Sequence, residues 1–136
     1  MSGRVILVAE DDPINQRLAN KILRHAGYEV LLAGDGAQAV AIARERIPDL
    51  ILMDLSMPVL SGWDATLELK MDPATHQIPI IACTAHAMAG DKAKSQTYGC
   101  DGYVAKPYTP DELLSAVAWG LNLGNAAAAG REPDDT

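Results

Sequence analysis

Acidic side chains follow two short apolar stretches of the chain, and they are the residues best suited to chemistry. Glu10, Asp11 and Asp12 follow one stretch, and Asp54 follows another. Carboxylates that are ionised together in one crevice repel one another, so they require raised pKa values or a bound cation. Because oxygen ligands with open positions suit Mg²⁺, this pattern predicts a magnesium site formed by carboxylates.

Two more polar residues, Thr84 and Lys106, stand at the ends of later apolar stretches. A carboxylate can accept a phosphoryl group when Mg²⁺ bridges the oxygens and when a cation and a hydroxyl or amide donor stabilise the spread charge. The acid pair, Asp54, Thr84 and Lys106 supply those parts. A nucleotide-binding protein would instead carry a glycine-rich loop after its first strand, where this chain has EDDP at 10–13.

The elements that must position these residues alternate between buried strands and helices. Apolar stretches predict strands over 4–9, 28–33, 49–53, 79–83 and 102–105. Helical spacing and capping residues predict helices from Ile14 to a stop at Gly27, over 37–46, 63–70 and 91–98, and from the cap at Thr109 to about Leu121. Five such pairs predict an α/β protein with a parallel sheet, helices on both faces and right-handed crossovers. Ligands bind at the carboxyl ends of the strands in such a sheet, which is where the polar residues stand.

Composition and charge favour one globular domain and exclude several classes of function. The chain has 136 residues, 49% of them hydrophobic, and a formal net charge of -7. This acidity argues against direct binding of nucleic acid, which needs a basic surface. No apolar stretch is long enough to span a bilayer and the first residues do not resemble a signal peptide, so we expect a cytoplasmic protein without membrane insertion. Cys83 and Cys100 lack the spacing of a disulfide framework or a zinc site, which also favours a reducing compartment.

The last residues differ in composition from the rest of the chain. From Asn122 onward the sequence is rich in glycine, asparagine and alanine, and it ends in GREPDDT. Such a composition offers few side chains that could be buried in a core. We therefore expect one folded domain over 1–122 and a flexible or disordered tail over 123–136.

Four motifs together resemble the receiver domain of two-component response regulators. They are the acid pair at 10–11, DLSMP at 54–58 with Gly62, TA at 84–85, and YVAKP at 103–107. The resemblance covers roughly residues 4–121. It implies a flavodoxin-like, doubly wound (βα)5 fold with the strand order 2-1-3-4-5. It also implies that the peptide bond between Lys106 and Pro107 is cis.

The resemblance further implies a chemical role for the acidic residues. Asp54 would be the phosphoacceptor, taking a phosphoryl group from a histidine of a sensor kinase or of a histidine phosphotransfer protein. Mg²⁺ would be held by the carboxylates of Glu10, Asp11 and Asp54 and by the backbone carbonyl of Ser56. The longer side chain of Glu10 leaves open whether it binds the metal directly or through water.

The remaining motif residues would respond to the phosphoryl group. Thr84 would direct its hydroxyl toward that group, and Lys106 would pair with a phosphoryl oxygen. Tyr103 would change rotamer together with Thr84, so these two residues would form the switch. Ser56 and His86 each stand two residues past a site residue, and we expect both to tune how water reaches the aspartyl phosphate.

The function predicted on these grounds is that of a phosphoaspartate receiver in a two-component phosphorelay. Its signal would leave through a protein-interaction face built from the helix 91–98, the strand 102–105 and the last helix. The protein would be a monomer or a phosphorylation-linked dimer. We do not expect an enzyme, because slow self-phosphorylation from small phosphodonors and slow self-dephosphorylation would be its only catalysis. A receiver segment of a hybrid histidine kinase fits the same residues.

Other interpretations explain single residues but not the whole set. Asp54 alone could cap a turn, and Asp12, which precedes Pro13, fits a helix N-cap better than a metal ligand. A Mg²⁺-dependent aspartyl-phosphate phosphatase needs a second acid two residues beyond its nucleophile, where this chain has Ser56. A flavodoxin-like electron carrier needs a hydroxyl- and glycine-rich phosphate loop where this chain has EDDP.

Overall fold

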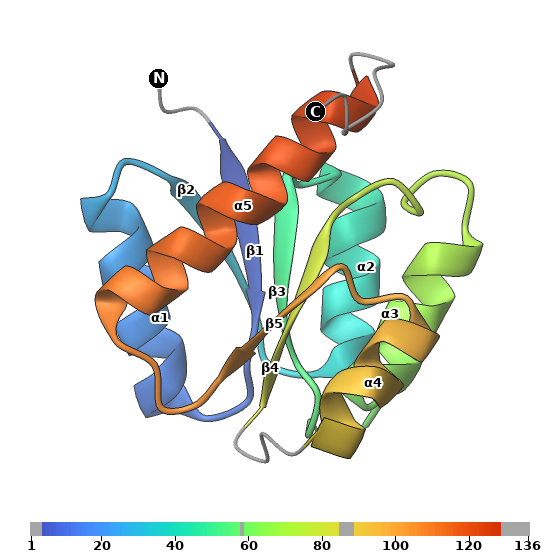
Figure 1. Ribbon diagram of the computed structural model, residues 1–136, viewed down its shortest axis with the longest axis horizontal. Helices are drawn as coiled ribbons and strands as arrows, with labels where there is room; N and C mark the ends of the chain where they lie inside the picture. The colour runs from blue at the N-terminus through green and yellow to red at the C-terminus, as the bar shows by residue number, and fades with distance from the viewer. Residues whose placement is uncertain (1–3, 58, 85–88, 129–136) are drawn as a thin grey trace.

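The computed structural model describes residues 4–57, 59–84 and 89–128 of the chain, along which strands and helices alternate (Figure 1). The strands are β1 Val5–Ala9, β2 Glu29–Ala33, β3 Leu50–Asp54, β4 Ile80–Thr84 and β5 Gly102–Ala105. The helices are α1 Pro13–His25, α2 Gly36–Arg46, α3 Gly62–Met71, α4 Ala89–Tyr98 and α5 Pro110–Ala128. Every strand and every helix predicted from the sequence is present.

The strands form one parallel sheet in the order β2-β1-β3-β4-β5. This is the flavodoxin-like order that the family resemblance implied, so the fold prediction is confirmed. α1 and α5 cover one face of the sheet, and α2 and α3 cover the other, with α4 beside α3 (Figure 1). The direction in which the chain adds strands reverses between β1 and β3. The carboxyl ends of these two strands therefore border the crevice in which such folds bind ligands.

Each face of the sheet has its own hydrophobic core. On one face Leu50 of β3 packs in a cluster with Leu23 of α1. On the other face Ile51 belongs to a cluster with Leu69 of α3. All four side chains are fully buried. Successive residues of β3 thus serve opposite cores, which explains why the strand is apolar at nearly every position.

Helix caps fix the loops that leave the carboxyl edge of the sheet. Asp12 accepts a hydrogen bond from the N–H of Ile14 at 3.1 Å and Pro13 is the first residue of α1, so Asp12 is the N-cap that the sequence predicted. Before α5, the N–H of Glu112 donates to Oγ1 of Thr109 at 3.1 Å, and the N–H of Thr109 donates to Oε1 of Glu112 at 2.9 Å. This reciprocal capping box fixes the point at which α5 begins.

The last helix is longer than its sequence pattern indicated. We expected it to end near Leu121, with a tail over 123–136, but α5 continues to Ala128. Alanine is the strongest helix former, and a run of alanines continues the helix past the weaker residues before it. The helix thus extends into residues 123–128 of the predicted tail, and 129–136 lie outside the described residues. Although α5 has 19 residues, no helix of the described chain is long and apolar enough to cross a membrane.

The apolar residues of α1 that are buried differ from those that the helical spacing predicted. Ile14 and Leu18 continue the helical stripe that includes Leu23, yet they are 72% and 46% exposed. Ala19 and Leu23 are the buried residues of α1 instead. Ile14 and Leu18 consequently leave an apolar surface in the first half of the helix, next to the carboxyl edge of the sheet.

Candidate functional site

The residues predicted to do chemistry lie together at the carboxyl edge of the sheet. Asp54 is the last residue of β3, and Glu10 and Asp11 follow β1 directly. One carboxylate oxygen from each of these three residues lies within 4.8 Å of the other two. Thr84 ends β4, and Lys106 follows β5. Four strand ends therefore contribute to one site.

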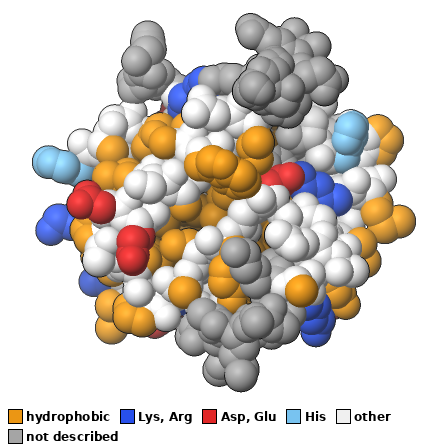
Figure 2. All heavy atoms as spheres, in the orientation of Figure 1, with side chains coloured by type: hydrophobic (Ala, Val, Ile, Leu, Met, Phe, Trp, Pro, Cys, Tyr) orange, Lys and Arg blue, Asp and Glu red, His pale blue; other side chains and the backbone are white. Residues whose placement is uncertain are grey.

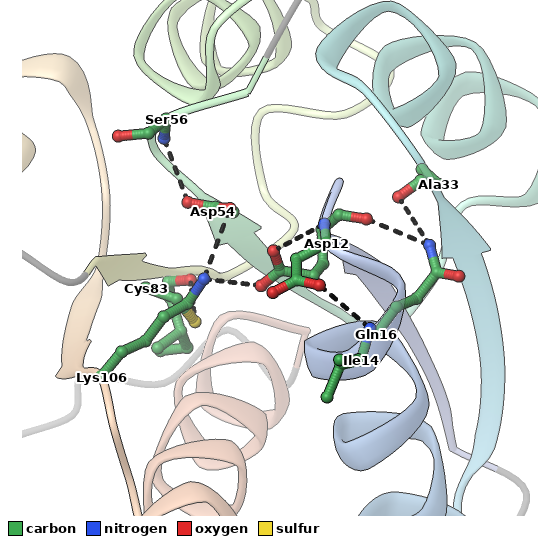
Figure 3. Close-up of polar contacts among 10 residues, drawn as sticks. Asp12, Ile14, Gln16, Ala33, Asp54, Ser56, Cys83 and Lys106 are labelled. Carbon is green, nitrogen blue, oxygen red and sulfur yellow. Dashed lines mark hydrogen bonds and ion pairs between the residues drawn. The ribbon is translucent and has the colours of Figure 1, made fainter.

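Lys106 is the cation of this cluster. Its Nζ lies 2.6 Å from Oε1 of Glu10 and 3.4 Å from Oδ2 of Asp54 (Figure 3). The Lys106 side chain is only 15% exposed, so water screens these contacts weakly. Burial opposes the charge on Lys106, but the hydrogen bond to Glu10 and the charges of Asp54 and Glu10 outweigh burial and raise the pKa of Lys106. The side chain is thus a cation at neutral pH, and it holds together two carboxylates that would otherwise repel each other.

Asp54 is held on its other side by the backbone. Its Oδ1 accepts a hydrogen bond from the N–H of Ser56 at 3.0 Å (Figure 3). Burial of the side chain raises the pKa of Asp54, and the negative charge of Glu10 adds to this effect. The Ser56 N–H and Lys106 act in the opposite direction without cancelling it. Because burial destabilises the ionised form of Asp54, a further cation bound at the site would stabilise that form.

Hydrogen bonds fix both the side chain and the backbone of Glu10. Its Oε1 accepts from Lys106, and its Oε2 accepts from the N–H of Asp12 at 3.2 Å. Nε2 of Gln16 donates to the backbone carbonyl of Glu10 at 3.1 Å and to that of Ala33 at 3.4 Å (Figure 3). Gln16 thereby ties together the ends of β1 and β2. Sequence reasoning missed this residue because a single amide on a helix belongs to no motif.

Of the other predicted site residues, Thr84 lies at the same edge, whereas Tyr103 lies further back along β5. Thr84 is buried, and its backbone carbonyl accepts a hydrogen bond from the N–H of Lys106 at 2.8 Å. Tyr103 is half-buried on β5, against the core on the α2 and α3 side. The peptide bond between Lys106 and Pro107 is cis, as the resemblance implied. His86, which was predicted to tune the phosphoryl lifetime, lies outside the described residues.

A groove beside Lys106 was not anticipated from the sequence. It has a volume of about 390 Å³ and is lined by Asn15, Leu18, Lys106, Pro107 and Tyr108. Burial raises the pKa of Tyr108 to about 12, so its phenol stays neutral at physiological pH. The helical spacing of Leu18 is typical of a buried core residue. The sequence therefore did not indicate that this side chain would be exposed and would line a groove.

Comparison with known proteins assigns the family. The family model of the response regulator receiver domain matches residues 6–118. The chain belongs to the response regulator receiver family. The polar-differentiation response regulator DivK of Brucella anthropi is 37% identical to this receiver over 112 residues, which cover 82% of this chain and 91% of DivK.

Solved structures of receivers have the same fold. The receiver domain of the sensor histidine kinase PA1611 from Pseudomonas aeruginosa PAO1 is 40% identical, with a TM-score of 0.83, and the match covers 88% of this chain and 98% of that domain. The chemotaxis protein CheY4 of Vibrio cholerae is 28% identical, with a TM-score of 0.82, and the match covers 86% of this chain and 98% of CheY4. This receiver is therefore similar both to a response regulator and to the receiver domain of a sensor histidine kinase.

The donor set of this receiver fits a magnesium ion. The PA1611 receiver has a magnesium ion coordinated in its active-site cleft. Here Glu10, Asp11 and Asp54 offer only oxygen donors, which is the chemistry Mg²⁺ prefers. Asp11 is exposed, so the cluster opens to solvent on its side and leaves room for water or a phosphoryl group.

The raised pKa of Asp54 gives the receiver a defined dependence of stability on pH. The folded protein keeps the proton of Asp54 at pH values where the unfolded chain has lost it. At pH values above the pKa of Asp54 in the folded protein, ionisation of Asp54 therefore lowers the free energy of unfolding. This destabilisation disappears as the pH falls toward the pKa of Asp54 in the unfolded chain. We expect Asp54→Asn to unfold at a higher urea concentration than the wild type at neutral pH with EDTA. That advantage should vanish near pH 4, roughly the pKa of an unperturbed aspartate. An Asn variant that is less stable at neutral pH would contradict this reading of the site.

Proposed function

We propose that this receiver accepts a phosphoryl group on Asp54, in a reaction that needs Mg²⁺, from a phosphohistidine of a sensor kinase or a histidine phosphotransfer protein. One observation carries the proposal. The Asp54 carboxylate lies beside the acid pair and is bridged to Glu10 by the partly buried Lys106, at the point where the strand order of the sheet reverses. Phosphoryl transfer depends on positioning and on positive charge near the transferring oxygens, which Lys106 and a Mg²⁺ ion held by these carboxylates would supply.

Each residue has a definite part in the transfer. An oxygen of Asp54 attacks the phosphorus, the bond from phosphorus to the histidine nitrogen breaks, and that nitrogen keeps the electron pair. Asp11, Asp54 and the Ser56 carbonyl would hold Mg²⁺ directly. Glu10, whose two oxygens already accept hydrogen bonds, would hold it through water. When bound, Mg²⁺ supplies positive charge for the phosphoryl oxygens.

Lys106 and Thr84 would bind the phosphoryl group once it is transferred. Lys106 already reaches Asp54, so a phosphoryl oxygen would replace part of its contact with Glu10. Thr84 ends the neighbouring strand and would supply a hydroxyl donor. Ser56, whose side chain is exposed beside Asp54, and His86 would tune the access of water to the aspartyl phosphate. Hydrolysis would be slow, so the protein is a receiver and not a turnover enzyme.

The donor protein has a surface to dock on next to Asp54. The Asp54 side chain is only 7% exposed, so a donor must approach closely. The groove beside Lys106 and the exposed Ile14 and Leu18 offer apolar contact area within reach of that carboxylate. A donor of this kind would act in the cytoplasm, and the buried, free thiols of Cys83 and Cys100 are compatible with such a reducing compartment.

The signal would leave through the face formed by α4, β5 and α5, with Thr84 and Tyr103 as the switch. A hollow of about 360 Å³ lies on this face, lined in part by Tyr103, Gln96 and Trp119. Hydrophobic side chains gather over the same region (Figure 2). Trp119 is 50% exposed, which makes it a candidate anchor for a protein target or for a second copy of the receiver. A free-standing regulator and a segment of a hybrid kinase would both use this face.

Transfer from a small phosphodonor tests the proposal without knowledge of the kinase. The receiver is incubated with acetyl phosphate, with Mg²⁺ or with EDTA, and its intact mass is measured. We expect one phosphoryl adduct, which needs Mg²⁺ and is absent in Asp54→Asn. Asp111→Asn is the matched control, because Asp111 is an exposed aspartate in the first turn of α5. An adduct that persists in Asp54→Asn, or that forms equally well in EDTA, would refute the proposal.

A further inference from the structure

The described side chains of α4 contribute little to the buried core of the receiver. Each of the other four helices contributes buried residues to one of the two cores. Among the described side chains of α4, none is buried, and Tyr98 in the last turn is half-buried. An element with few buried contacts needs little free energy to move. A modest contact between α4 and a neighbouring element can therefore influence where α4 lies.

Such a contact joins α4 to α3. The rings of Trp63 on α3 and Tyr98 on α4 have centroids 5.3 Å apart and are tilted by 56°. Nζ of Lys94, one turn before Tyr98, lies 4.7 Å from the centroid of the Trp63 ring and 5.9 Å from that of Tyr98. Both distances are within the range of a cation–π interaction. Lys94, Trp63 and Tyr98 thus form one cluster, which we call the latch.

The α3 side of the latch is fixed to the strand end that carries Asp54. The N–H of Gly62 donates to the carbonyl of Leu55 at 3.1 Å. A Cβ at Gly62 would lie 2.0 Å from the carbonyl oxygen of Asp54, so the backbones touch without any spare room. Trp63 is the next residue. The start of α3 is therefore tied closely to the strand end that carries Asp54.

We propose that the latch holds α4 in the position seen here and opposes a shift of α4 that phosphorylation of Asp54 favours. This inference rests on the proposed function. A phosphoryl group adds charge and bulk at the end of β3, next to Thr84, from which the chain runs on toward α4. α3 is packed against that strand end too closely to yield. The weakly anchored α4 responds instead, and it must give up the contact of Lys94 with Trp63 to do so.

The latch would therefore set how readily the receiver adopts its phosphorylated form. When a ligand binds only one of two conformers, its apparent affinity falls with the fraction of protein in the non-binding conformer. Destabilising the non-binding conformer therefore raises the apparent affinity. An exposed cation–π contact shifts such an equilibrium by about two- to fivefold. This range is small enough for tuning and large enough to measure.

Beryllofluoride, which mimics a phosphoryl group on a carboxylate, is the probe for the test. Its apparent affinity is measured by calorimetry at saturating Mg²⁺ for the wild type, Lys94→Met and Tyr98→Leu. We expect both variants to bind about two- to fivefold more tightly than the wild type, because the conformer they weaken is the one without a phosphoryl group. Lys94→Arg and Tyr98→Phe keep the cation and the ring, and both should match the wild type. Lys21→Met removes an exposed cation on α1 and should have no effect.

The outcomes separate the two proposals. Equal or weaker affinity of Lys94→Met and Tyr98→Leu, with normal binding by the wild type, overturns the latch and leaves the proposed function intact. Tighter binding by Lys21→Met as well would mean that net charge, not the latch, is responsible, and it also overturns the inference. If the wild type binds no beryllofluoride, both the proposed function and the latch are wrong.

Discussion

Transfer of a phosphoryl group from acetyl phosphate to Asp54 should slow by about 100-fold when Lys106 is replaced by alanine, the usual effect of removing one donor that stabilises transition-state charge. Nζ of Lys106 is the cation already positioned at the acceptor, 3.4 Å from Oδ2 of Asp54. In the transition state the phosphoryl oxygens carry spread negative charge at that position. The rate of adduct formation by intact mass, at saturating Mg²⁺, measures the effect.

Lys106→Ala should also raise the affinity of the site for Mg²⁺, although it slows phosphoryl transfer. Lys106 lies 2.6 Å from Glu10, so it neutralises part of the charge that would otherwise attract Mg²⁺. Lys106→Ala should therefore bind Mg²⁺ more tightly while it transfers phosphoryl more slowly. Lys21→Ala, an exposed lysine of α1, should change neither quantity. Weaker Mg²⁺ binding by Lys106→Ala would show that the lysine organises the site in some way other than through its charge.

The free energy of unfolding should fall by about 3 kcal/mol or more in Gly62→Ala, the upper part of the range for overpacking a close contact. A methyl group at Gly62 would meet the carbonyl oxygen of Asp54 at 2.0 Å and Cα of Leu55 at 2.7 Å. Both are backbone atoms at the end of β3, so neither can rotate away. The start of α3 must move instead, which also displaces the Ser56 loop that binds Asp54.

Gly34→Ala is the matched control for this prediction. Its added methyl group would meet only Oε1 of Gln38, at the ordinary contact distance of 3.7 Å. A glycine replaced without strain loses conformational entropy mainly in the unfolded chain, so Gly34→Ala should be neutral or slightly stabilising. Urea unfolding of both variants measures the difference. Equal stability of Gly62→Ala and the wild type would mean that α3 is not packed against the strand end as described.

The sheet and most of the site were predictable because short buried strands leave strong patterns. Asp54, Thr84 and Lys106 each stand at the end of an apolar stretch, and parallel strands bring such ends to one edge. Asp12 was correctly separated from the acid pair, because a following proline is typical of a helix N-cap. Local sequence was sufficient wherever a residue's neighbours along the chain determine its position.

Features that depend on packing between distant elements were not predictable. The exposure of Ile14 and Leu18 follows from how α1 lies on the sheet, which its own spacing does not reveal. The bridge from Gln16 to Ala33 needs the register of β1 against β2. The sequence did not indicate that α5 continues to Ala128, because glycine and asparagine, which are weaker helix formers, precede the alanines.

The residue that carries the phosphoryl group can be identified chemically. The receiver is phosphorylated with acetyl phosphate and Mg²⁺, and the acyl phosphate is reduced with borohydride, which converts a phosphorylated aspartate to homoserine. Peptide mass spectrometry then locates the modified residue. We predict homoserine at position 54 and at no other aspartate. A modified residue elsewhere, or a phosphoryl group on a histidine, would contradict it.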